Sequence, residues 1–246
     1  MWVITGASSG IGKAFVEHII TELKVDPSQI LCIGRSSCKL EQLRCVGGES
    51  LRLLPMDLSN YHSNYYHLKK TLDGDRITNL INCAGVCYKP TSFRERDFES
   101  ILYETHTNLT GTMSLVHGAL KLWNKEEKGH IMCVSSPIGK VPIPNYATYS
   151  ATKAALISFC ECLREELKQT TKINVSCVLP TLTTTEMTKE GLKPSRFIYA
   201  LEATYVAKQM ANLVLGAHSG VKSIGLQAEV AVVVQRVSPF INKLFL

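Results

Sequence analysis

The sequence predicts a single doubly wound α/β domain, in which helices flank both faces of a parallel sheet. Two observations predict it. Short apolar runs rich in β-branched residues alternate with longer stretches whose apolar residues recur every three or four positions. A glycine-rich turn separates the first apolar run from the first helical stretch. Regular alternation of this kind favours parallel strands that are covered by helices on both sides.

Six apolar runs are expected to be the strands, and the stretches between them are expected to be helices. Ile11, Phe15 and Ile19 repeat at four-residue spacing between the first two runs, as a buried helix face requires. No linker, internal repeat or low-complexity stretch divides the chain, so we expect one domain over residues 1–246. The runs are Trp2 to Thr5, Ile30 to Ile33, Leu51 to Leu54, Asn79 to Asn82, His130 to Val134 and Asn174 to Val178.

The composition excludes several classes of function. Lys and Arg (27) exceed Asp and Glu (21) by only six and form no run of five, so we expect no nucleic-acid partner. The nine cysteines lack a C-x-x-C pair, which favours reduced, buried thiols over disulfides and predicts no metal site. No apolar run approaches a membrane span, and a strand begins too early for a signal peptide. We therefore expect a cytoplasmic protein, or one on the cytoplasmic side of a membrane.

The turn after the first run, "TGASSGIG" at 5–12, predicts a phosphate site. A triphosphate-binding loop of the form G-x-x-x-x-G-K-[ST] is excluded, because Ala7 and Ala14 occupy two of its required positions. Glycines in this turn instead let backbone N–H groups approach a pyrophosphate at the start of the following helix, as in Rossmann-type domains. The glycines are Gly6, Gly10 and Gly12.

The end of the second run predicts the cofactor. A protein that prefers NAD usually carries an acidic residue there, about 20 residues after the glycine turn, for the ribose 2′-hydroxyl. This chain has Arg35. A guanidinium attracts the 2′-phosphate of NADP(H), which is the predicted cofactor; the alternative is a solvated surface arginine.

A Tyr-x-x-x-Lys pair, Tyr149 and Lys153, begins a long helical stretch and predicts acid–base chemistry. Four-residue spacing places both side chains on one helix face. A neighbouring ammonium is expected to lower the phenol pKa from about 10 towards neutrality, where the phenol serves as a general acid or base.

The same spacing recurs in two overlapping pairs, Tyr65/Lys69 and Tyr66/Lys70, which serve as internal comparisons. Only Tyr149 follows a Ser135–Ser136 pair at the end of an apolar strand. A proline-containing loop, "PIGKVPIPNYAT", connects that strand to the helix and is a candidate wall of a substrate pocket.

The chain resembles the short-chain dehydrogenase/reductase family over nearly its whole length. The motifs that carry the resemblance occur in the family's order and spacing. They are "TGASSGIG" at 5–12, "NCAG" at 82–85, "NLTG" at 108–111, "VSS" at 134–136, "YSATK" at 149–153 and "PTLTTT" at 180–185.

The resemblance implies a role for individual residues. Tyr149 is the implied proton donor to the substrate carbonyl, Ser136 its hydrogen-bonding partner, and Lys153 the residue that holds the nicotinamide ribose. Asn108 is implied to support a proton-relay water, the alternative being a polar helix position. The residues implied to bind the cofactor are Gly6, Ser8, Ser9, Gly10, Ile11, Gly12, Arg35, Asp57, Asn82, Ala84, Gly85, Tyr149, Lys153, Pro180, Thr183 and Thr185.

Two of these implied contacts have an alternative role, and two positions beside them depart from the family pattern. Asp57 is implied to contact adenine, although Asp57 and Asn82 could instead cap helices. The family's usual second asparagine is replaced by Cys83, and its glycine after Pro180 is replaced by Thr181. The second change makes the geometry of that loop less predictable.

The implied function is NADP(H)-dependent interconversion of a small-molecule carbonyl and a secondary alcohol by hydride transfer. Two alternatives stay open: a non-catalytic NADP(H)-binding sensor or scaffold, and a ketoacyl-thioester reductase. The glycine-rich tail typical of the acyl-carrier-protein reductases is missing. A short substrate lid near 186–201 has few apolar residues, which predicts a modestly hydrophobic ligand.

The carboxyl-terminal segment carries an apolar stripe spaced at threes and fours, interrupted by Pro239. Such a stripe needs an apolar partner. We expect it to pack on its own chain or on a second copy in a homodimer or other homo-oligomer, or else to contact a membrane surface. The stripe comprises Val230, Val233, Val234, Val237, Ile241, Leu244 and Phe245.

Overall fold

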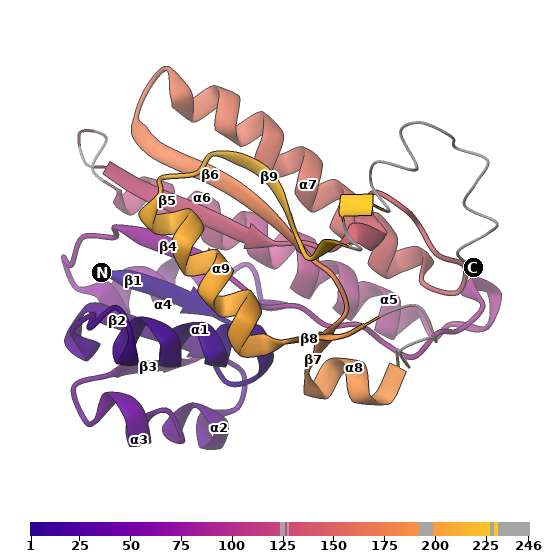
Figure 1. Ribbon diagram of the computed structural model, residues 1–246, viewed down its shortest axis with the longest axis horizontal. Coiled ribbons are helices and arrows are strands. Elements are labelled where there is room, and N and C mark those ends of the chain that lie inside the picture. Colours follow the sequence, from indigo (N-terminus) through magenta and orange to yellow (C-terminus); the bar gives the residue numbers. More distant parts are fainter. Residues whose placement is uncertain (124–125, 127, 192–198, 227–228, 231–246) are drawn as a thin grey trace.

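The computed structural model describes residues 1–123, 126, 128–191, 199–226 and 229–230 (Figure 1). Most of the carboxyl-terminal stripe and the middle of the expected lid lie outside the described residues. The elements, in chain order, are β1 (Trp2–Thr5), α1 (Gly10–Thr21), η1 (Pro27–Gln29), β2 (Ile30–Gly34), α2 (Ser37–Glu41), α3 (Arg44–Gly47), β3 (Arg52–Pro55), α4 (Asn64–Leu72), β4 (Asn79–Asn82), η2 (Phe93–Glu95), α5 (Phe98–Thr105), η3 (His106–Thr110), α6 (Gly111–Leu122), β5 (Lys128–Val134), η4 (Pro137–Gly139), α7 (Ala147–Lys168), β6 (Lys172–Pro180), β7 (Thr183–Thr184), α8 (Glu186–Gly191), β8 (Leu201–Glu202), α9 (Ala203–Leu215) and β9 (Gly220–Ile224).

The main sheet is parallel and has the strand order β3-β2-β1-β4-β5-β6-β9 among the described residues. Thr5, at the end of β1, pairs with Ile33 of β2 on one side and with Asn82 of β4 on the other. The strand order therefore reverses between β1 and β4. In doubly wound sheets, ligands bind beside the carboxyl ends of the strands at this reversal. The predicted fold class is confirmed.

The predicted strands match the structure closely, with differences at their ends. The first and fourth runs have the observed bounds, whereas β3 is shifted by one residue and β5 and β6 are longer than their apolar runs. The strand β9 was not predicted. Its sequence, "GVKSI", buries only the two end residues, Gly220 and Ile224, and it pairs with β6 alone at the edge of the sheet.

Each face of the sheet has its own hydrophobic core, because successive side chains of a strand point to opposite faces. In β1, Val3 packs in the core that α4, α6 and α7 cover, and Ile4 packs in the core that α1 and α9 cover. In α7, Leu156, Cys160 and Leu163 supply the predicted buried stripe. Figure 1 shows α1 and α9, which pack against each other, on the same face of the sheet.

A π-helical turn, η3, joins α5 to α6. The N–H group of Gly111 donates to the carbonyl oxygen of His106, five residues earlier, so the turn holds one residue more than an α-helix would. A side chain at Gly111 would place its Cβ 2.2 Å from the carbonyl oxygen of Leu58. The absence of a side chain there lets the helix pass directly against the loop that follows β3.

A buried histidine lies between β5 and β6, away from the carboxyl edge. His130 is 3% exposed, and its Nε2 is 2.7 Å from the hydroxyl of Ser176. Within the described residues its Nδ1 has no hydrogen-bond partner. Burial lowers the pKa of His130 to about 4, and the nearby His218 acts in the same direction. The imidazole is therefore neutral in the folded protein near neutral pH.

The cysteines are free thiols. The prediction of buried thiols is right for Cys32, Cys133, Cys160 and Cys177, but Cys38, Cys45 and Cys162 are exposed. In the part of the chain that the structure describes, no helix has the length and apolar character of a membrane span. Nor do His, Cys, Asp or Glu side chains gather there in a group of three or more suited to a metal ion.

Candidate active site

A cleft of about 1420 Å³ opens at the carboxyl edge of the sheet. Its walls come from the glycine turn, the segments after β2, β4, β5 and β6, and the start of α8. Three predicted site residues, Asp57, Asn82 and Asn108, lie behind these walls. The predicted residues that line the cleft are Gly6, Ser8, Ser9, Gly10, Ile11, Gly12, Arg35, Ala84, Gly85, Ser136, Tyr149, Lys153, Pro180, Thr183 and Thr185.

The glycine turn packs so closely on itself and on Ala84 that two of its positions have no room for a side chain. Gly6 has a φ of +65°, and a Cβ there would lie 2.8 Å from the nitrogen of Ala84. A Cβ at Gly12 would lie 2.3 Å from the carbonyl oxygen of Gly6. Ser9, the N-cap of α1, makes no side-chain cap hydrogen bond, which leaves the first N–H groups of α1 uncapped at the cleft. This arrangement fits a pyrophosphate.

The segment after β6 covers the glycine turn from the other side of the cleft. A Cβ on Gly10 would lie 3.1 Å from Cγ2 of Thr185. The hydroxyl of Thr183 donates to the carbonyl oxygen of Thr181 at 2.8 Å. The N–H of Thr181, which stands where the family has glycine, donates to Ile224 of β9 at 2.9 Å. The substituted position is therefore anchored to the edge strand.

Arg35 lies at the cleft and is held by a residue that sequence reasoning missed. Its Nη1 donates to the hydroxyl of Tyr103, which donates to Oδ2 of Asp57 at 3.0 Å. The guanidinium carbon is 5.8 Å from the centroid of the Tyr103 ring. Asp57 also accepts from the N–H of Ser59 at 2.9 Å. Asp57 is thus hydrogen-bonded to its own loop and to Tyr103. It does not line the cleft, and its connection to the cleft runs through Tyr103 to Arg35.

Asn82 and Thr5 form a buried polar link beneath the glycine turn. The hydroxyl of Thr5 donates to Oδ1 of Asn82 at 2.7 Å, and Nδ2 of Asn82 donates to Thr112 of α6 at 2.9 Å. The N–H of Ala84 donates to the hydroxyl of Thr5 at 3.1 Å. Asn82 therefore positions the cleft wall at Ala84 and does not line the cleft itself.

Ser136 and Tyr149 both line the cleft. The side chain of Ser136 acts to lower the pKa of the Tyr149 phenol, and its hydroxyl accepts from the N–H of Ile138 at 3.3 Å. The hydroxyl of Ser135 instead donates to the backbone carbonyl of Lys153 at 2.8 Å. Of the two serines, Ser136 is the one that faces the phenol, which agrees with the residue selected by the family resemblance.

The pKa of Tyr149 differs from the sequence expectation. Burial raises it above its usual value, and the side chains of Cys87 and Glu104 act in the same direction. Nζ of Lys153 lies beside the ring, 5.5 Å from its centroid, and donates to the carbonyl oxygen of Val134 at 3.0 Å. The expected lowering is therefore wrong for this structure, because the effect of burial exceeds the lowering effect of the Ser136 side chain.

Asn108 is fully buried in the π-helical turn and clamps the segment that follows β4. Its Oδ1 accepts from the N–H of Val86 at 2.7 Å, and its Nδ2 donates to the carbonyl oxygen of the same residue at 2.8 Å. Nδ2 is also 3.4 Å from the hydroxyl of Thr152 in α7. A Cβ on Gly85 would lie 3.3 Å from Asn108 and 3.4 Å from Nζ of Lys153. Asn108 therefore sits next to the lysine and fixes the wall between them.

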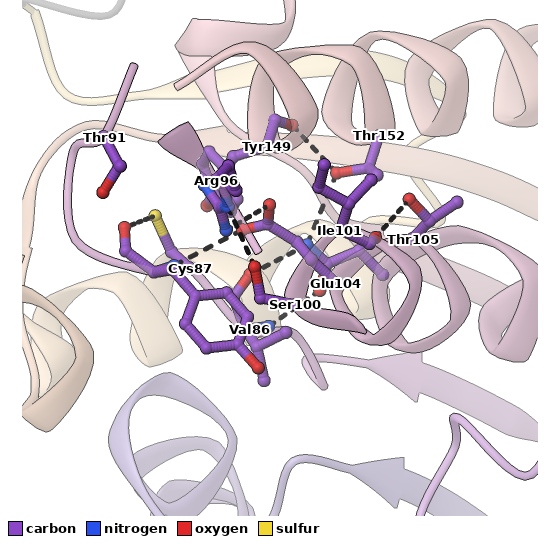
Figure 2. Close-up of polar contacts among 12 residues, drawn as sticks. Val86, Cys87, Thr91, Arg96, Ser100, Ile101, Glu104, Thr105, Tyr149 and Thr152 are labelled. Atoms are coloured by element: carbon purple, nitrogen blue, oxygen red, sulfur yellow. Dashed lines mark hydrogen bonds and ion pairs between the residues drawn. The ribbon is translucent and has the colours of Figure 1, made fainter. Parts of the chain in front are cut away.

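A buried ion pair on the substrate side of the cleft was not predicted. Nη2 of Arg96 lies 3.0 Å from Oε2 of Glu104, and the two side chains are 4% and 0% exposed. Figure 2 shows the pair among the polar contacts that connect α5 with the segment carrying Val86 and Cys87. Glu104 precedes Asn108 by four residues. This helical spacing was the signal in the sequence that could have indicated Glu104 as a residue near the site.

The two comparison tyrosines lie elsewhere. Both are in α4, where Tyr66 is 71% exposed and Tyr65 packs against Gly118 of α6. Neither lines the cleft. Their lysines share the spacing of the Tyr149 pair but not its burial.

The substrate side of the cleft is largely apolar. The proline-containing loop lines it, as the sequence predicted, and the first residues of α8 line it from the expected lid. Glu186 of α8 makes an ion pair with Lys39 of α2 at 2.6 Å. The loop residues at the cleft are Pro137, Ile138, Val141, Pro142, Ile143 and Tyr146.

Comparison with known proteins shows which family this chain resembles in sequence. The family model described as short chain dehydrogenase matches residues 1–195. Human 17-beta-hydroxysteroid dehydrogenase type 3 is 31% identical over 195 residues, which are 76% of this chain and 60% of that protein. Mouse very-long-chain 3-oxoacyl-CoA reductase is 33% identical over 194 residues, with the same coverage. The chain thus spans about 60% of the length of these relatives.

A short-chain type dehydrogenase/reductase from Sinorhizobium fredii is 32% identical over 197 residues, which are 78% of this chain and 75% of that protein. Two solved structures share the fold with a TM-score of 0.82. The 3-ketoacyl-(acyl-carrier-protein) reductase of Brucella melitensis, complexed with NADH, is 20% identical and matches 91% of this chain and 95% of its own. A short chain dehydrogenase of Burkholderia cenocepacia, in complex with NADP, is 22% identical and matches 97% and 93%.

Proposed function

Because the chain belongs to the short chain dehydrogenase family, we propose that it is an NADP(H)-dependent oxidoreductase that reduces a carbonyl to a secondary alcohol, or catalyses the reverse reaction. The observation that carries the proposal is that Ser136 and Tyr149, with Lys153 beside the phenol ring, line the same cleft as the glycine turn.

When bound, the nicotinamide supplies the hydride. Ser136 and Tyr149 present two hydroxyls to one position in the cleft, where both can donate to a carbonyl oxygen. Since burial raises the pKa of Tyr149, its phenol stays protonated near neutral pH and has a proton to give. The ammonium of Lys153 then stabilises the negative charge that remains on the phenolate.

Arg35 supports NADP(H) over NAD(H). The solved relatives hold NADH in one case and NADP in another, so they support a nicotinamide cofactor of either kind. In this chain the position after β2 carries a guanidinium, which Tyr103 holds at the cleft. A 2′-phosphate would gain a charge-assisted hydrogen bond there, whereas the 2′-hydroxyl of NADH would gain a weaker one.

The lining of the cleft supports a lipophilic ketone or secondary alcohol as the substrate. Val141, Pro142 and Ile143 line one side of it, and Met187 and Leu226 line the other. The relatives named above act, by their names, on hydroxysteroids and on very-long-chain 3-oxoacyl-CoA. The second name favours 3-oxoacyl-thioester reduction as a second candidate function. The proposed cytoplasmic location and homo-oligomer rest on the sequence alone.

Oxidation of NADPH in the presence of a carbonyl panel tests the proposal. The panel should include steroid ketones, 3-oxoacyl thioesters and simple methyl ketones. We expect turnover with at least one class and its loss in Tyr149→Phe. A protein that binds NADPH tightly but turns over none of the panel would favour the sensor or scaffold alternative.

A further inference from the structure

Arg96 places a charged group in the wall of the cleft at a distance from the catalytic pair. It follows η2 and lines the cleft together with Tyr88 and Ser100. Although its side chain is only 4% exposed, it belongs to the surface that a ligand would meet. The proposed proton transfer does not use it.

The guanidinium is held in one orientation by three neighbours. Nη2 pairs with Glu104 at 3.0 Å, Nε donates to the hydroxyl of Ser100 at 3.3 Å, and the guanidinium carbon lies 5.0 Å from the centroid of the Tyr88 ring. Glu104 also accepts from the N–H of Tyr88 at 3.4 Å. Figure 2 shows Arg96, Ser100 and Glu104 within this contact network. A side chain fixed in this way is suited to recognition at a defined position.

These contacts leave donors unused. A guanidinium carries five N–H bonds, and the contacts within the described residues engage Nε and Nη2, while none of them engages Nη1. Nη1 is not one of the buried atoms that lack a partner in the described residues, and Arg96 lines the cleft, so Nη1 is open to an acceptor that a ligand brings. A hydrogen bond to a charged donor of this kind contributes about tenfold or more to affinity. We propose that Nη1 of Arg96 binds a second oxygen atom of the substrate, remote from the carbonyl that reacts at Tyr149, and so determines specificity.

The charge of the subsite defines the class of oxygen. The carboxylate of Glu104 neutralises Arg96 and is itself fully buried. A second carboxylate brought beside it would be repelled. The subsite therefore selects an uncharged acceptor, such as the carbonyl of a ketone or ester, or a hydroxyl. This inference rests on the proposed carbonyl chemistry and adds a requirement for a bifunctional substrate.

The test compares methyl ketones of equal length with and without a second carbonyl: 2-hexanone, 2-heptanone and 2-octanone against 2,5-hexanedione, 2,6-heptanedione and 2,7-octanedione. The readout is the ratio of kcat/KM for dione over monoketone in wild type, Arg96→Met and Arg94→Met. Arg94 is exposed and outside the cleft, which makes it the matched control. The wild-type ratio for the best-fitting pair should exceed that of Arg96→Met by about tenfold, and Arg94→Met should match wild type.

A merely structural arginine would lower both rates equally and leave the ratio unchanged. If Arg96→Met does not fold, Arg96→Lys replaces it, since lysine keeps a cation for Glu104 but lacks Nη1. The keto acid 6-oxoheptanoate, whose two carbonyl carbons have the same spacing as those of 2,7-octanedione, should gain less from Arg96 than the dione does. Equal ratios in wild type and both Arg96 variants, for every chain length, would overturn the inference, and a larger gain for the keto acid would overturn the preference for an uncharged oxygen.

A binding readout separates this inference from the proposed function. Equilibrium dialysis of the NADPH complex against each ketone measures the same ratio without turnover. If wild type reduces none of the ketones, the proposed function fails for this substrate class, while the binding ratio still decides the role of Arg96. Unequal binding in wild type that disappears in Arg96→Met supports the subsite, and equal binding in both refutes it.

Discussion

The hydroxyl of Ser136, just beyond the end of β5, acts on the phenol of Tyr149 in the first turn of α7 and opposes the rise in its pKa. Ser135, its neighbour in the chain, points instead to the backbone of Lys153. Adjacent residues of an extended segment face opposite ways, so the two serines have different tasks despite their identical chemistry.

Substitution of the two serines should separate these tasks. Ser136→Ala removes a donor to the substrate oxygen and should lower kcat by about a hundredfold. Ser135→Ala removes a buried hydrogen bond to Lys153 and should lower the free energy of unfolding by about 1–2 kcal/mol, with a smaller effect on kcat. Steady-state kinetics and urea unfolding measure both. Equal kinetic losses in the two variants would contradict the assignment.

Tyr149→Phe should lower kcat at least about a hundredfold, because general acid catalysis contributes on that scale. NADPH affinity should change little, since the glycine turn and Arg35 are untouched. Lys153→Ala should reduce both kcat and NADPH affinity. The matched controls Tyr65→Phe and Tyr66→Phe, which repeat the spacing outside the cleft, should keep kcat within about twofold. Near-normal turnover in Tyr149→Phe would move the reaction to another site.

Arg35 should confer a preference for NADPH over NADH of about 1–3 kcal/mol, the range for a hydrogen bond to a charged group. Arg35→Asp should reverse that preference by repelling the 2′-phosphate. Fluorescence titration of each nucleotide measures it without turnover. Lys168→Asp, which makes the same charge change at the far end of α7, should leave the preference unaltered. A wild type that favours NADH would refute the cofactor assignment.

His130 should make the fold sensitive to acid. Its pKa is about 4 in the folded protein, against an ordinary value of 6.5. Between these values the unfolded chain takes up a proton that the folded protein does not, so stability falls as pH falls. The full contribution, present above pH 6.5 and lost below pH 4, is about 3 kcal/mol.

His130→Gln should therefore show a smaller drop in the free energy of unfolding between pH 6.5 and pH 4 than wild type does. Urea unfolding across this pH range measures the drop. His67→Gln, at an exposed position of α4, is the control and should behave like wild type. An undiminished drop in His130→Gln would show that other groups cause the acid sensitivity.

The fold was predictable from the sequence because the apolar runs of the central strands are nearly continuous, as expected for strands buried on both faces. The edge strand β9 escaped prediction for the complementary reason. It has one neighbouring strand and leaves Lys222 exposed, so its sequence lacks a continuous apolar run. The local composition of an edge strand carries little information about its pairing.

The site was predictable where residues follow strand ends, and less so where tertiary structure brings polar side chains together. Arg96 and Glu104 belong to a polar stretch that resembles a solvated surface, yet both are buried. Tyr103 reaches Arg35 from a helix far along the chain. Spacing placed Lys153 beside Tyr149, but it did not reveal that the ammonium would bond to Val134 and leave burial to set the phenol pKa.

The extra residue in η3 puts α5 and α6 out of phase by about 100°, one residue's rotation in an α-helix. The two helices can then present Glu104 to the cleft segment and Leu115 to the sheet, although they form one continuous rod. Deleting one residue within 106–110 would shorten the rod only slightly and restore regular helical hydrogen bonding. It would also rotate one half of the helix relative to the other. The helix would therefore still form, but the residues that it contributes to the site would be misplaced. Insertions and deletions here should therefore be far more damaging than substitutions of these residues other than Asn108.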